Sequence, residues 1–424
     1  MIPASRAFAA LIPNSTSSMM NDTVLIAGAG HAGFQVAVSL RQAKYAGRIA
    51  LINDEKHLPY QRPPLSKAYL KSGGDPDSLM FRPEKFFQDQ AIELIPDRMV
   101  SIDREARKLL LASGTAIEYG HLVLATGARN RMLDVPNASL PDVLYLRTLD
   151  ESEVLRQRMP EKKRVVVIGA GFIGLEFAAT ARGKGLEVDV VELAPRVMAR
   201  AVTPEISSYF HDRHTTAGIR LHYGVRATEI EADSDRVTGV ALSNGQTLPC
   251  DLVVVGVGVI PNVEIAAAAG LPTAAGIIVN EQLLTGDPNI SAIGDCALFE
   301  SVRFGETMRV ESVQNAADQA RCVAARLTGD AKAYDGYPWF WSDQGDDKLQ
   351  IVGLTAGFDQ VVIRGSVAER SFSAFCYKAG KLIGIESVNR AADHVFGRKI
   401  LPLDKSVTPE QAADLGFDLK KAIA

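Results

Sequence analysis

Two glycine-rich segments of the same form stand far apart in the chain. They are Gly28-Ala29-Gly30-His31-Ala32-Gly33 and Gly169-Ala170-Gly171-Phe172-Ile173-Gly174. Each follows a short apolar run and precedes a run with helical spacing. In that context the glycines let the backbone approach a pyrophosphate, and the helix N-terminus supplies oriented N–H donors. One such motif is weak evidence because loops are rich in glycine, but the pair indicates two bound dinucleotides.

An acidic residue follows each motif at about the distance at which a carboxylate can bind a ribose. In the second unit it is Glu192, which would accept both ribose hydroxyls and repel a 2′-phosphate, so NADH is expected rather than NADPH. Arg196 and Arg200 follow closely and could instead bind such a phosphate. In the first unit the candidates are Asp54 and Glu55, which differ by one residue of strand register.

The elements that must hold the motifs repeat the same order twice. An apolar strand, the glycine turn, a helix and a second strand form a βαβ unit in each case. The first unit comprises 24–27, 34–41 and 49–52, and the second comprises 164–168, 175–184 and 188–191. A later apolar strand, at 121–125 or 252–255, returns toward each nucleotide and runs into Thr126-Gly127 or Gly256-Val257-Gly258.

The last part of the chain has a different pattern. A helix at 311–327 is followed by alternating strands at 349–354, 360–364, 372–378 and 382–388, and the last two are joined at Ala379-Gly380. A short helix at 409–415 follows Thr408 as its N-cap. The predicted fold is therefore α/β, with two Rossmann-like dinucleotide-binding domains and a C-terminal α+β domain. The predicted domains are 21–130 with 261–335 for the first nucleotide, 131–260 for the second and 336–424 for the last, after a disordered leader at 1–20.

Composition narrows the classes of function. Hydrophobic residues make up 47% of the chain and charged residues 23%, as in ordinary folded soluble proteins. With 46 Lys and Arg against 50 Asp and Glu, the net charge of -4 argues against nucleic-acid binding. No apolar run approaches the ~18 residues needed to span a membrane. Four scattered cysteines without metal-ligand spacing predict neither a disulfide framework nor a metal site, and they fit a reducing cytoplasm.

Further motifs resemble those of flavoproteins that bind two dinucleotides. Ala125-Thr126-Gly127 and the segment 285–295, which ends in Gly294-Asp295, are similar to two additional FAD-contact motifs of these reductases. Two longer motifs, 59–67 and 338–344, resemble the oxygenase-coupled NADH-dependent ferredoxin reductase family, which is putidaredoxin reductase-like. The resemblance extends from about residue 22 to the end of the chain. It implies a glutathione-reductase-like arrangement of the two Rossmann-like domains, with FAD and NADH as cofactors.

The resemblance also implies roles for individual residues. Arg62 would bind the FAD phosphates, and Asp295 would bind the ribityl hydroxyls. Lys67 would lie near the flavin N5 and form the catalytic pair with Glu176, because a fixed positive charge beside the atom that gains hydride stabilises the reduced flavin. The backbone of Val313 would contact the isoalloxazine, at a position where relatives often carry Trp. The further expected FAD contacts are Val100, Arg147, Glu311, Ser312 and Trp339.

Trp339 and Trp341, the two tryptophans of the chain, flank Phe340. An aromatic wall beside a flavin excludes water and restricts the face on which a nicotinamide can stack. We expect one tryptophan to face the cofactor and at least one to pack between domains.

The lack of a thiol in one segment indicates where the electrons go. Disulfide reductases of this fold need a cysteine pair beside the flavin, and related peroxidases and oxidases need a single cysteine, but 59–70 contains none. We therefore expect NADH to reduce FAD, and FAD to pass electrons one at a time to a small [2Fe-2S] ferredoxin that serves an oxygenase. Because such ferredoxins are commonly acidic, the candidate docking residues, by position alone, are Arg303, Arg309, Arg398 and Lys399. The protein is expected to be a monomer or weak dimer.

Two other functions are compatible with these motifs. One is a flavin-dependent NADH oxidase or quinone-type reductase without a protein partner. The other is a binding flavoprotein similar to apoptosis-inducing factor, which associates with nucleic acid. The acidic net charge and the lack of a long basic insertion count against the second.

Overall fold

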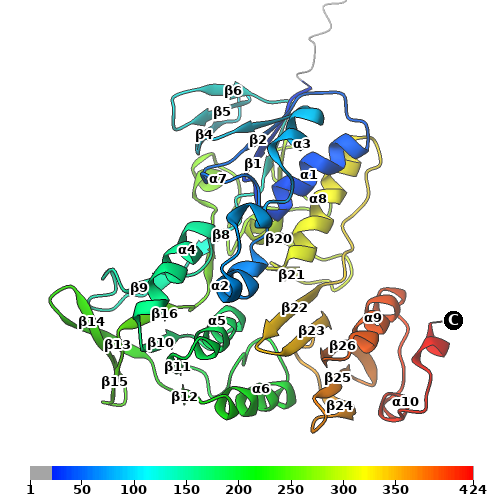
Figure 1. Cartoon of the computed structure of the whole chain (residues 1–424). Helices are drawn as coiled ribbons and strands as arrows, with labels where there is room; N and C mark the ends of the chain where they lie inside the picture. Colours follow the sequence, from blue (N-terminus) through cyan, green and yellow to red (C-terminus); the bar gives the residue numbers. More distant parts are fainter. Residues whose placement is uncertain (1–21, 424) are drawn as a thin grey trace, which may run out of the picture.

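The first nucleotide-binding part is built on a five-stranded parallel sheet (Figure 1). The computed structural model describes residues 22–423, so the predicted leader at 1–20 lies outside the described residues. In spatial order the strands are β19 (Ile290–Ala292), β7 (His121–Leu124), β1 (Val24–Ala27), β2 (Ile49–Ile52) and β3 (Ile92–Ile95). Helices α1 (His31–Gln42) and α8 (Val313–Leu327) lie side by side against this sheet.

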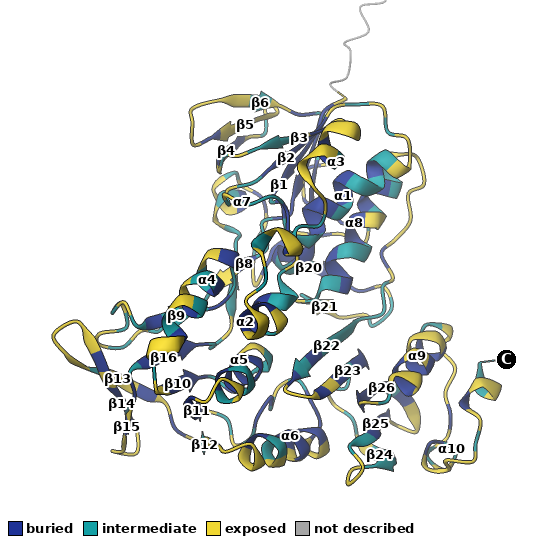
Figure 2. Cartoon of the chain, in the orientation of Figure 1, coloured by how far each residue is buried: buried dark blue, intermediate teal, exposed yellow. Residues whose placement is uncertain are grey.

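The second nucleotide-binding part repeats this architecture. In spatial order its strands are β12 (Ile219–Tyr223), β11 (Glu187–Glu192), β10 (Arg164–Ile168), β16 (Leu252–Val255) and β9 (Val143–Tyr145). Its helices are α4 (Leu149–Arg158), α5 (Phe172–Gly183) and α6 (Pro204–Thr216). Figure 2 shows the inner strands of both parallel sheets as buried, and this burial explains their continuous apolar sequences.

The helices after the two glycine motifs begin earlier than predicted. Helix α1 starts at His31 rather than residue 34, and α5 starts at Phe172 rather than residue 175. The last three residues of each glycine motif thus form the first helical turn. Helix α8 instead starts later than predicted, at Val313, because the Ser312 hydroxyl accepts a hydrogen bond from the Asn315 N–H and caps it.

Two short strands mark where the chain passes between the nucleotide-binding parts. Strand β8 (Ala128–Asn130) pairs antiparallel with β17 (Val259–Pro261). Beside them, the Thr126 hydroxyl donates to the Asn262 carbonyl at 2.9 Å, and the Asn262 side-chain amide donates to the Thr126 carbonyl at 2.8 Å. The predicted boundaries near residues 130 and 260 fall at this crossing, although the full extent of each domain stays a prediction.

Three small sheets and several short helices were not predicted. The strands are β4 (Met99–Asp103), β5 (Lys108–Leu111), β6 (Ala116–Glu118), β13 (Ala227–Asp233), β14 (Arg236–Leu242), β15 (Thr247–Pro249), β18 (Ile277–Val279), β20 (Ala297–Glu300) and β21 (Thr307–Met308). The helices are α2 (Ala68–Ser72), α3 (Glu84–Asp89) and α7 (Glu264–Ala268). Strands such as β4 bury only some of their residues, so their apolar signal in the sequence is weak.

The C-terminal part is a five-stranded antiparallel sheet with helices, which confirms the predicted α+β module. In spatial order its strands are β22 (Trp339–Gln344), β23 (Asp347–Gly353), β26 (Lys381–Val388), β25 (Ser371–Lys378) and β24 (Gln360–Ser366). The predicted hairpin is present, with Lys378 paired to Lys381. Helix α10 (Pro409–Ala413) has Thr408 as its N-cap, as predicted, but it ends at Ala413 rather than at residue 415. Helix α9 (Ala391–Ile400) was missed, because Gly397 and the mixed polar residues before it weaken the helical signal.

One buried carboxylate joins the C-terminal sheet to the second nucleotide-binding part. Asp347 on β23 is 2% exposed and accepts hydrogen bonds from Arg213 of α6 at 2.9 Å, from Arg370 at 2.6 Å and from the Asn389 amide at 2.9 Å. Burial tends to raise the pKa of Asp347, but these donors outweigh it and hold the pKa below its usual value. The contact therefore requires the ionised form.

We predict that Asp347→Ala lowers the free energy of unfolding by about 2 kcal/mol, because it removes charge-assisted hydrogen bonds from a buried acceptor. Asp346→Ala is the matched control, since Asp346 is the exposed neighbour. Chemical denaturation followed by circular dichroism compares the two. Equal stability of the two variants would contradict the role given to Asp347.

Candidate functional site

A single cavity collects most of the residues predicted to bind FAD. It lies between the first sheet, the start of α5 and strand β22. The predicted residues that line it are Gly28, Gly30, His31, Ala32, Asp54, Glu55, Arg62, Lys67, Ala125, Thr126, Gly127, Arg147, Phe172, Ile173, Glu176, Gly294, Asp295, Glu311, Ser312 and Val313. The structure therefore brings together segments that are up to 313 residues apart, from Gly28 to Trp341.

The first glycine motif has the shape that a diphosphate needs. A side chain at Gly28 would overlap the Ala125 carbonyl, and Gly28 has a φ of +110° that favours glycine. A side chain at Gly33 would overlap the Gly28 carbonyl. A Cβ at Gly30, by contrast, would meet nothing within 4 Å, so open space lies beside this backbone at the cavity. These residues fit the diphosphate of FAD.

The second motif repeats this geometry. A side chain at Gly169 would overlap the Gly256 carbonyl and one at Gly174 would overlap the Gly169 carbonyl, while a Cβ at Gly171 would meet nothing within 4 Å. Gly256, Val257 and Gly258 directly follow β16, beside the motif. The two βαβ units thus offer two equivalent cradles, as the sequence predicted for two dinucleotides.

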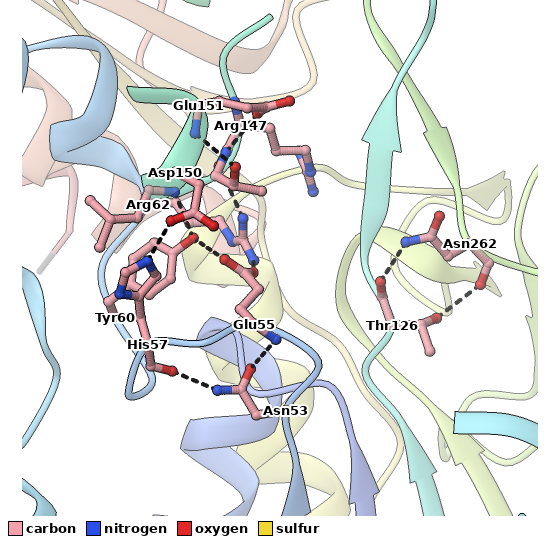
Figure 3. Close-up of polar contacts among 12 residues, drawn as sticks. Asn53, Glu55, His57, Tyr60, Arg62, Thr126, Arg147, Asp150, Glu151 and Asn262 are labelled. Carbon is pink, nitrogen blue, oxygen red and sulfur yellow. Dashed lines mark hydrogen bonds and ion pairs between the residues drawn. The ribbon is translucent and has the colours of Figure 1, made fainter. Parts of the chain in front are cut away.

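A hydrogen-bond network holds Arg62 in place at the cavity (Figure 3). Its guanidinium pairs with Glu55 and donates to the Arg147 carbonyl at 3.0 Å. The Tyr60 hydroxyl donates to Glu55 at 2.5 Å and accepts the Leu149 N–H at 3.0 Å. Burial tends to lower the pKa of Arg62, but Glu55 and Tyr60 raise it overall, so the guanidinium stays charged. Asp54 and Glu55 both line the cavity, so the choice of ribose ligand between them stays a prediction.

Positive charge and a helix N-terminus meet at the same end of the cavity. His31 begins α1, and burial, aided by the charge of Arg62, lowers the pKa of His31 to about 4. Its imidazole is therefore neutral at pH 7. Arg147, whose carbonyl accepts a hydrogen bond from Arg62, pairs with Asp295 at 3.0 Å. The donors at this end suit a bound anion.

Lys67 lies between two carboxylates. Its Nζ is 3.2 Å from Glu176 Oε1 and 3.3 Å from Asp343 Oδ2. Glu176 is buried and also accepts hydrogen bonds from the hydroxyls of Ser66 and Ser342, both at 2.5 Å. Burial raises the pKa of Glu176, and Lys67 and the two serines oppose that shift. The ion pair that the family resemblance implied is present, while its role in flavin chemistry stays a prediction.

The aromatic wall is formed by Trp341 and Phe340, not by Trp339. Phe340 packs against Phe172, with ring centroids 4.5 Å apart, and both line the cavity with Trp341. Trp339 does not line it; its ring lies under the guanidinium of Arg398, 4.2 Å from the ring centroid. Trp339 and Trp341 share one face of β22, and Trp339 lies one repeat farther along the strand, beyond the cavity.

Val100 also lies away from the cavity, since it is on β4 with an exposed side chain. Trp341 is one of the two tryptophans of which the sequence predicted that one faces the cofactor. Lining residues without a predicted role of their own include Ala29, Asn53, Tyr60, Leu65, Ser66, Leu146, Ile293, Ala316 and Phe340. Tyr60, Leu65, Ser66 and Phe340 fall inside the two long motifs, which were the signal that could have found them.

The second site has a carboxylate where the expected preference for NADH over NADPH requires one, and the preference itself stays a prediction. Glu192 ends β11 beside the second glycine motif, and its carboxylate accepts N–H hydrogen bonds from Ala170 at 2.7 Å and from Ala194 at 2.8 Å. Arg196 donates to the Ala199 carbonyl at 2.8 Å, so its own loop already engages it. The carboxylate, and not Arg196, is thus placed at the end of the strand where a nucleotide ribose would lie.

Two negative findings apply to the part of the chain that the structure describes. Within residues 22–423, no group of three or more His, Cys, Asp or Glu side chains could hold a metal ion. No helix in the same range is long and apolar enough to cross a membrane.

We predict that Gly30→Ala and Gly171→Ala fold normally but that each binds one of the two nucleotides more weakly. Each added methyl group meets no protein atom and instead enters the open space where a nucleotide would lie. Gly30→Ala should weaken FAD binding by about tenfold or more, and Gly171→Ala should keep FAD and raise KM for NADH to a similar extent. Flavin absorbance and NADH kinetics measure the two effects. Loss of FAD in both variants would contradict the assignment of one cradle to each nucleotide.

We also predict that Glu192→Ala combined with Leu193→Arg lowers the ratio of kcat/KM for NADH to that for NADPH by about tenfold or more. The change removes the charge that repels a 2′-phosphate and adds one that attracts it. Glu187→Ala, at the opposite end of the same strand, is the control. Unchanged discrimination between the nucleotides would remove Glu192 from this role.

Comparison with known proteins places the chain in a family. Residues 22–320 match the family of pyridine nucleotide-disulphide oxidoreductases, and residues 339–423 match the reductase C-terminal family. Rhodocoxin reductase of Rhodococcus erythropolis is 53% identical over 403 residues, which cover 95% of this chain and 94% of that protein.

Two solved structures are also similar. The crystal structure of the ferredoxin reductase for the CYP199A2 system from Rhodopseudomonas palustris has 94% sequence identity and a TM-score of 0.95, over 95% of this chain and 100% of that one. The covalent putidaredoxin reductase–putidaredoxin complex has 39% identity and a TM-score of 0.92, over 95% of this chain and 98% of that one. These matches confirm the predicted fold class, the cofactors and the activity. The chain belongs to the pyridine nucleotide-disulphide oxidoreductase family, in its putidaredoxin reductase-like group, and it is a ferredoxin reductase that uses FAD and NADH.

Proposed function

We propose that this reductase receives hydride from NADH at an FAD held in the cavity, and that a [2Fe-2S] ferredoxin accepts the electrons singly from a neighbouring basic groove. The observation that carries this proposal is a shared wall between cavity and groove. The residues that line both are His31, Pro63, Lys67, Val313 and Trp341. A flavin ring beside this wall would be close to a protein docked in the groove.

The charges in the groove suit an acidic partner. Its basic side chains are Lys67, Lys71, Arg82, Arg182, Lys184, Arg213 and Arg321. Its acidic residues are Asp343, Asp346 and Asp347, and two of them are already paired, Asp343 with Lys67 and Asp347 with Arg213. The groove is therefore positive although the whole chain carries a net charge of -4. Such a face steers an acidic protein toward it.

The four docking residues suggested from the sequence do not line the groove. Arg303 lies over the Tyr337 ring, Arg309 pairs with Glu311, and Arg398 lies over Trp339. Lys399 is also outside it. The basic residues of the groove replace these four as the proposed docking residues.

Bound FAD supplies an acceptor for hydride and a donor of single electrons. The residues of the chain hold that chemistry in place. The ammonium of Lys67 stabilises negative charge at the cavity wall, and the N-terminus of α8 at Val313 adds a second positive pole. Phe172 and Phe340 exclude water from the side where the second nucleotide would enter.

A thiol route for the electrons has no support among the described residues. No cysteine is among the residues that line the cavity. Cys296 follows Asp295 in sequence, but it is fully buried, its Sγ donates to the Ile293 carbonyl at 3.2 Å, and burial raises the pKa of its thiol. A protonated, enclosed thiol is a poor relay, which favours electron release through the groove.

We further propose that the ferredoxin belongs to an oxygenase system, because the reductase with 94% identity is described as serving the CYP199A2 system. A cytoplasmic location is supported by the four cysteines, all of which are unpaired. The monomer or weak dimer expected from the sequence stays a prediction.

We predict that Lys71→Glu combined with Arg321→Glu raises KM for an acidic [2Fe-2S] ferredoxin by about tenfold or more at low ionic strength, with a smaller effect in high salt. Both residues are exposed and line the groove. NADH-dependent reduction of ferricyanide should be unchanged, because the small acceptor needs no docking surface.

Arg236→Glu, on the exposed β14 hairpin outside the groove, is the matched control for charge reversal. Cytochrome c reduction should be fast only when ferredoxin is added, and NADH consumption in air should be slow without it. Rapid aerobic NADH consumption without ferredoxin would support the oxidase alternative. An unaltered KM for ferredoxin in the double variant would show that the groove is not the docking surface.

A further inference from the structure

We propose that Asp343 is a positioning residue for the flavin site, which holds the Lys67 ammonium from the groove side, opposite Glu176. The inference rests on the flavin function of the cavity and not on the docking role of the groove. It gives a reason for an acidic residue in a groove that otherwise favours an acidic partner.

The geometry sets Lys67 between two unlike carboxylates. The Nζ atom is 3.2 Å from Glu176 and 3.3 Å from Asp343, so neither carboxylate holds it alone. The Glu176 side chain is 5% exposed, and the Asp343 side chain is 39% exposed. One partner therefore lies in the protein interior and the other at the edge of the groove.

The two carboxylates differ in what else they bind. Glu176 accepts hydrogen bonds from two serine hydroxyls in addition to its contact with Lys67. Its oxygens therefore keep hydrogen-bond donors if the ammonium moves. Among residues 22–423, the Asp343 carboxylate forms ion pairs with Lys67 and, at 3.9 Å, with Lys348. Asp343 thus pulls the ammonium outward, against the inward pull of Glu176, and the balance sets where the positive charge lies.

A third contact limits the path of the ammonium. Lys67 Nζ lies 5.8 Å from the centroid of the Trp341 ring, and Trp341 lines both the cavity and the groove. Asp343 is two residues further along β22 on the same face of the strand as Trp341. Strand β22 therefore supplies both the aromatic wall and the carboxylate that contacts Lys67 from the groove side. A small shift of the Lys67 ammonium changes the electrostatic field at the wall that the flavin would contact.

The competing explanation is that Asp343 does not act through Lys67. Its charge would then affect the flavin directly through space, or its side chain would only affect folding. A double-mutant cycle separates the two, because a residue that acts through Lys67 loses its effect when Lys67 is removed. The four proteins are the wild type, Asp343→Asn, Lys67→Met and the double variant. Asp346→Asn is the matched control, since it changes the same charge on an exposed residue of the same groove.

The readouts are the midpoint potential of bound FAD and the rate of flavin reduction by NADH in a single turnover. We expect Asp343→Asn to raise the potential, because one of the two negative charges that offset Lys67 is gone, and to change the reduction rate by about three- to tenfold. In the Lys67→Met background the same substitution should retain less than about a third of either effect. Asp343→Glu should restore the wild-type potential, and Asp346→Asn should not alter it.

The proposal is overturned if Asp343→Asn has the same effect with and without Lys67, or if Asp346→Asn matches it. It is also overturned if Asp343→Asn leaves both readouts at wild-type values. Absorbance spectra check that each variant retains FAD. Reduction of the wild type by NADH tests the proposed function separately, so that a failure there is distinguishable from a failure of the cycle.

Discussion

The buried carboxylate of Glu176 is bound from all three parts of the fold at once. Glu176 belongs to α5 of the second nucleotide-binding part, Ser66 and Lys67 come from the first, and Ser342 comes from the C-terminal sheet. A buried carboxylate is costly unless its oxygens are satisfied. Those donors are available only when the three parts meet in one arrangement, so the geometry of the cavity and the burial of Glu176 depend on each other.

That arrangement explains how one site can serve two partners of very different size. The cavity is lined by residues of both nucleotide-binding parts and of β22, and the basic groove lies directly beside it. Lys67 and Trp341 belong to both walls. Hydride chemistry needs exclusion of water and a fixed orientation. Electron transfer to a protein needs only close approach, so a thin wall between the two spaces satisfies both requirements.

Charge is unevenly distributed over the molecule. The chain as a whole is slightly acidic, yet basic residues from α2, α5, α6 and α8 converge on the groove. Their distance in sequence hides this convergence. Candidate docking residues chosen by sequence position, such as Arg303 and Arg398, instead pack on aromatic rings elsewhere.

The sequence alone determined the local chemistry. The glycines at 28, 30 and 33 and at 169, 171 and 174, the carboxylate at 192 and the lack of cysteine at 59–70 were all visible as types and spacings, because each depends on neighbours a few residues away. These features predicted both βαβ units and the two nucleotides. The α+β character of the end of the chain was also readable from its alternating pattern, although α9 was not.

Only the tertiary structure decided which residues share a wall. It showed that Trp341, rather than Trp339, lines the cavity, that Val100 does not line it, and that Lys67 contacts both Glu176 and Asp343. Strand periodicity places Trp339 and Trp341 on one face but does not say where along that face the cavity ends. A contact between residues 67 and 343 depends on how distant parts of the fold pack, and no local pattern in the sequence contains that information.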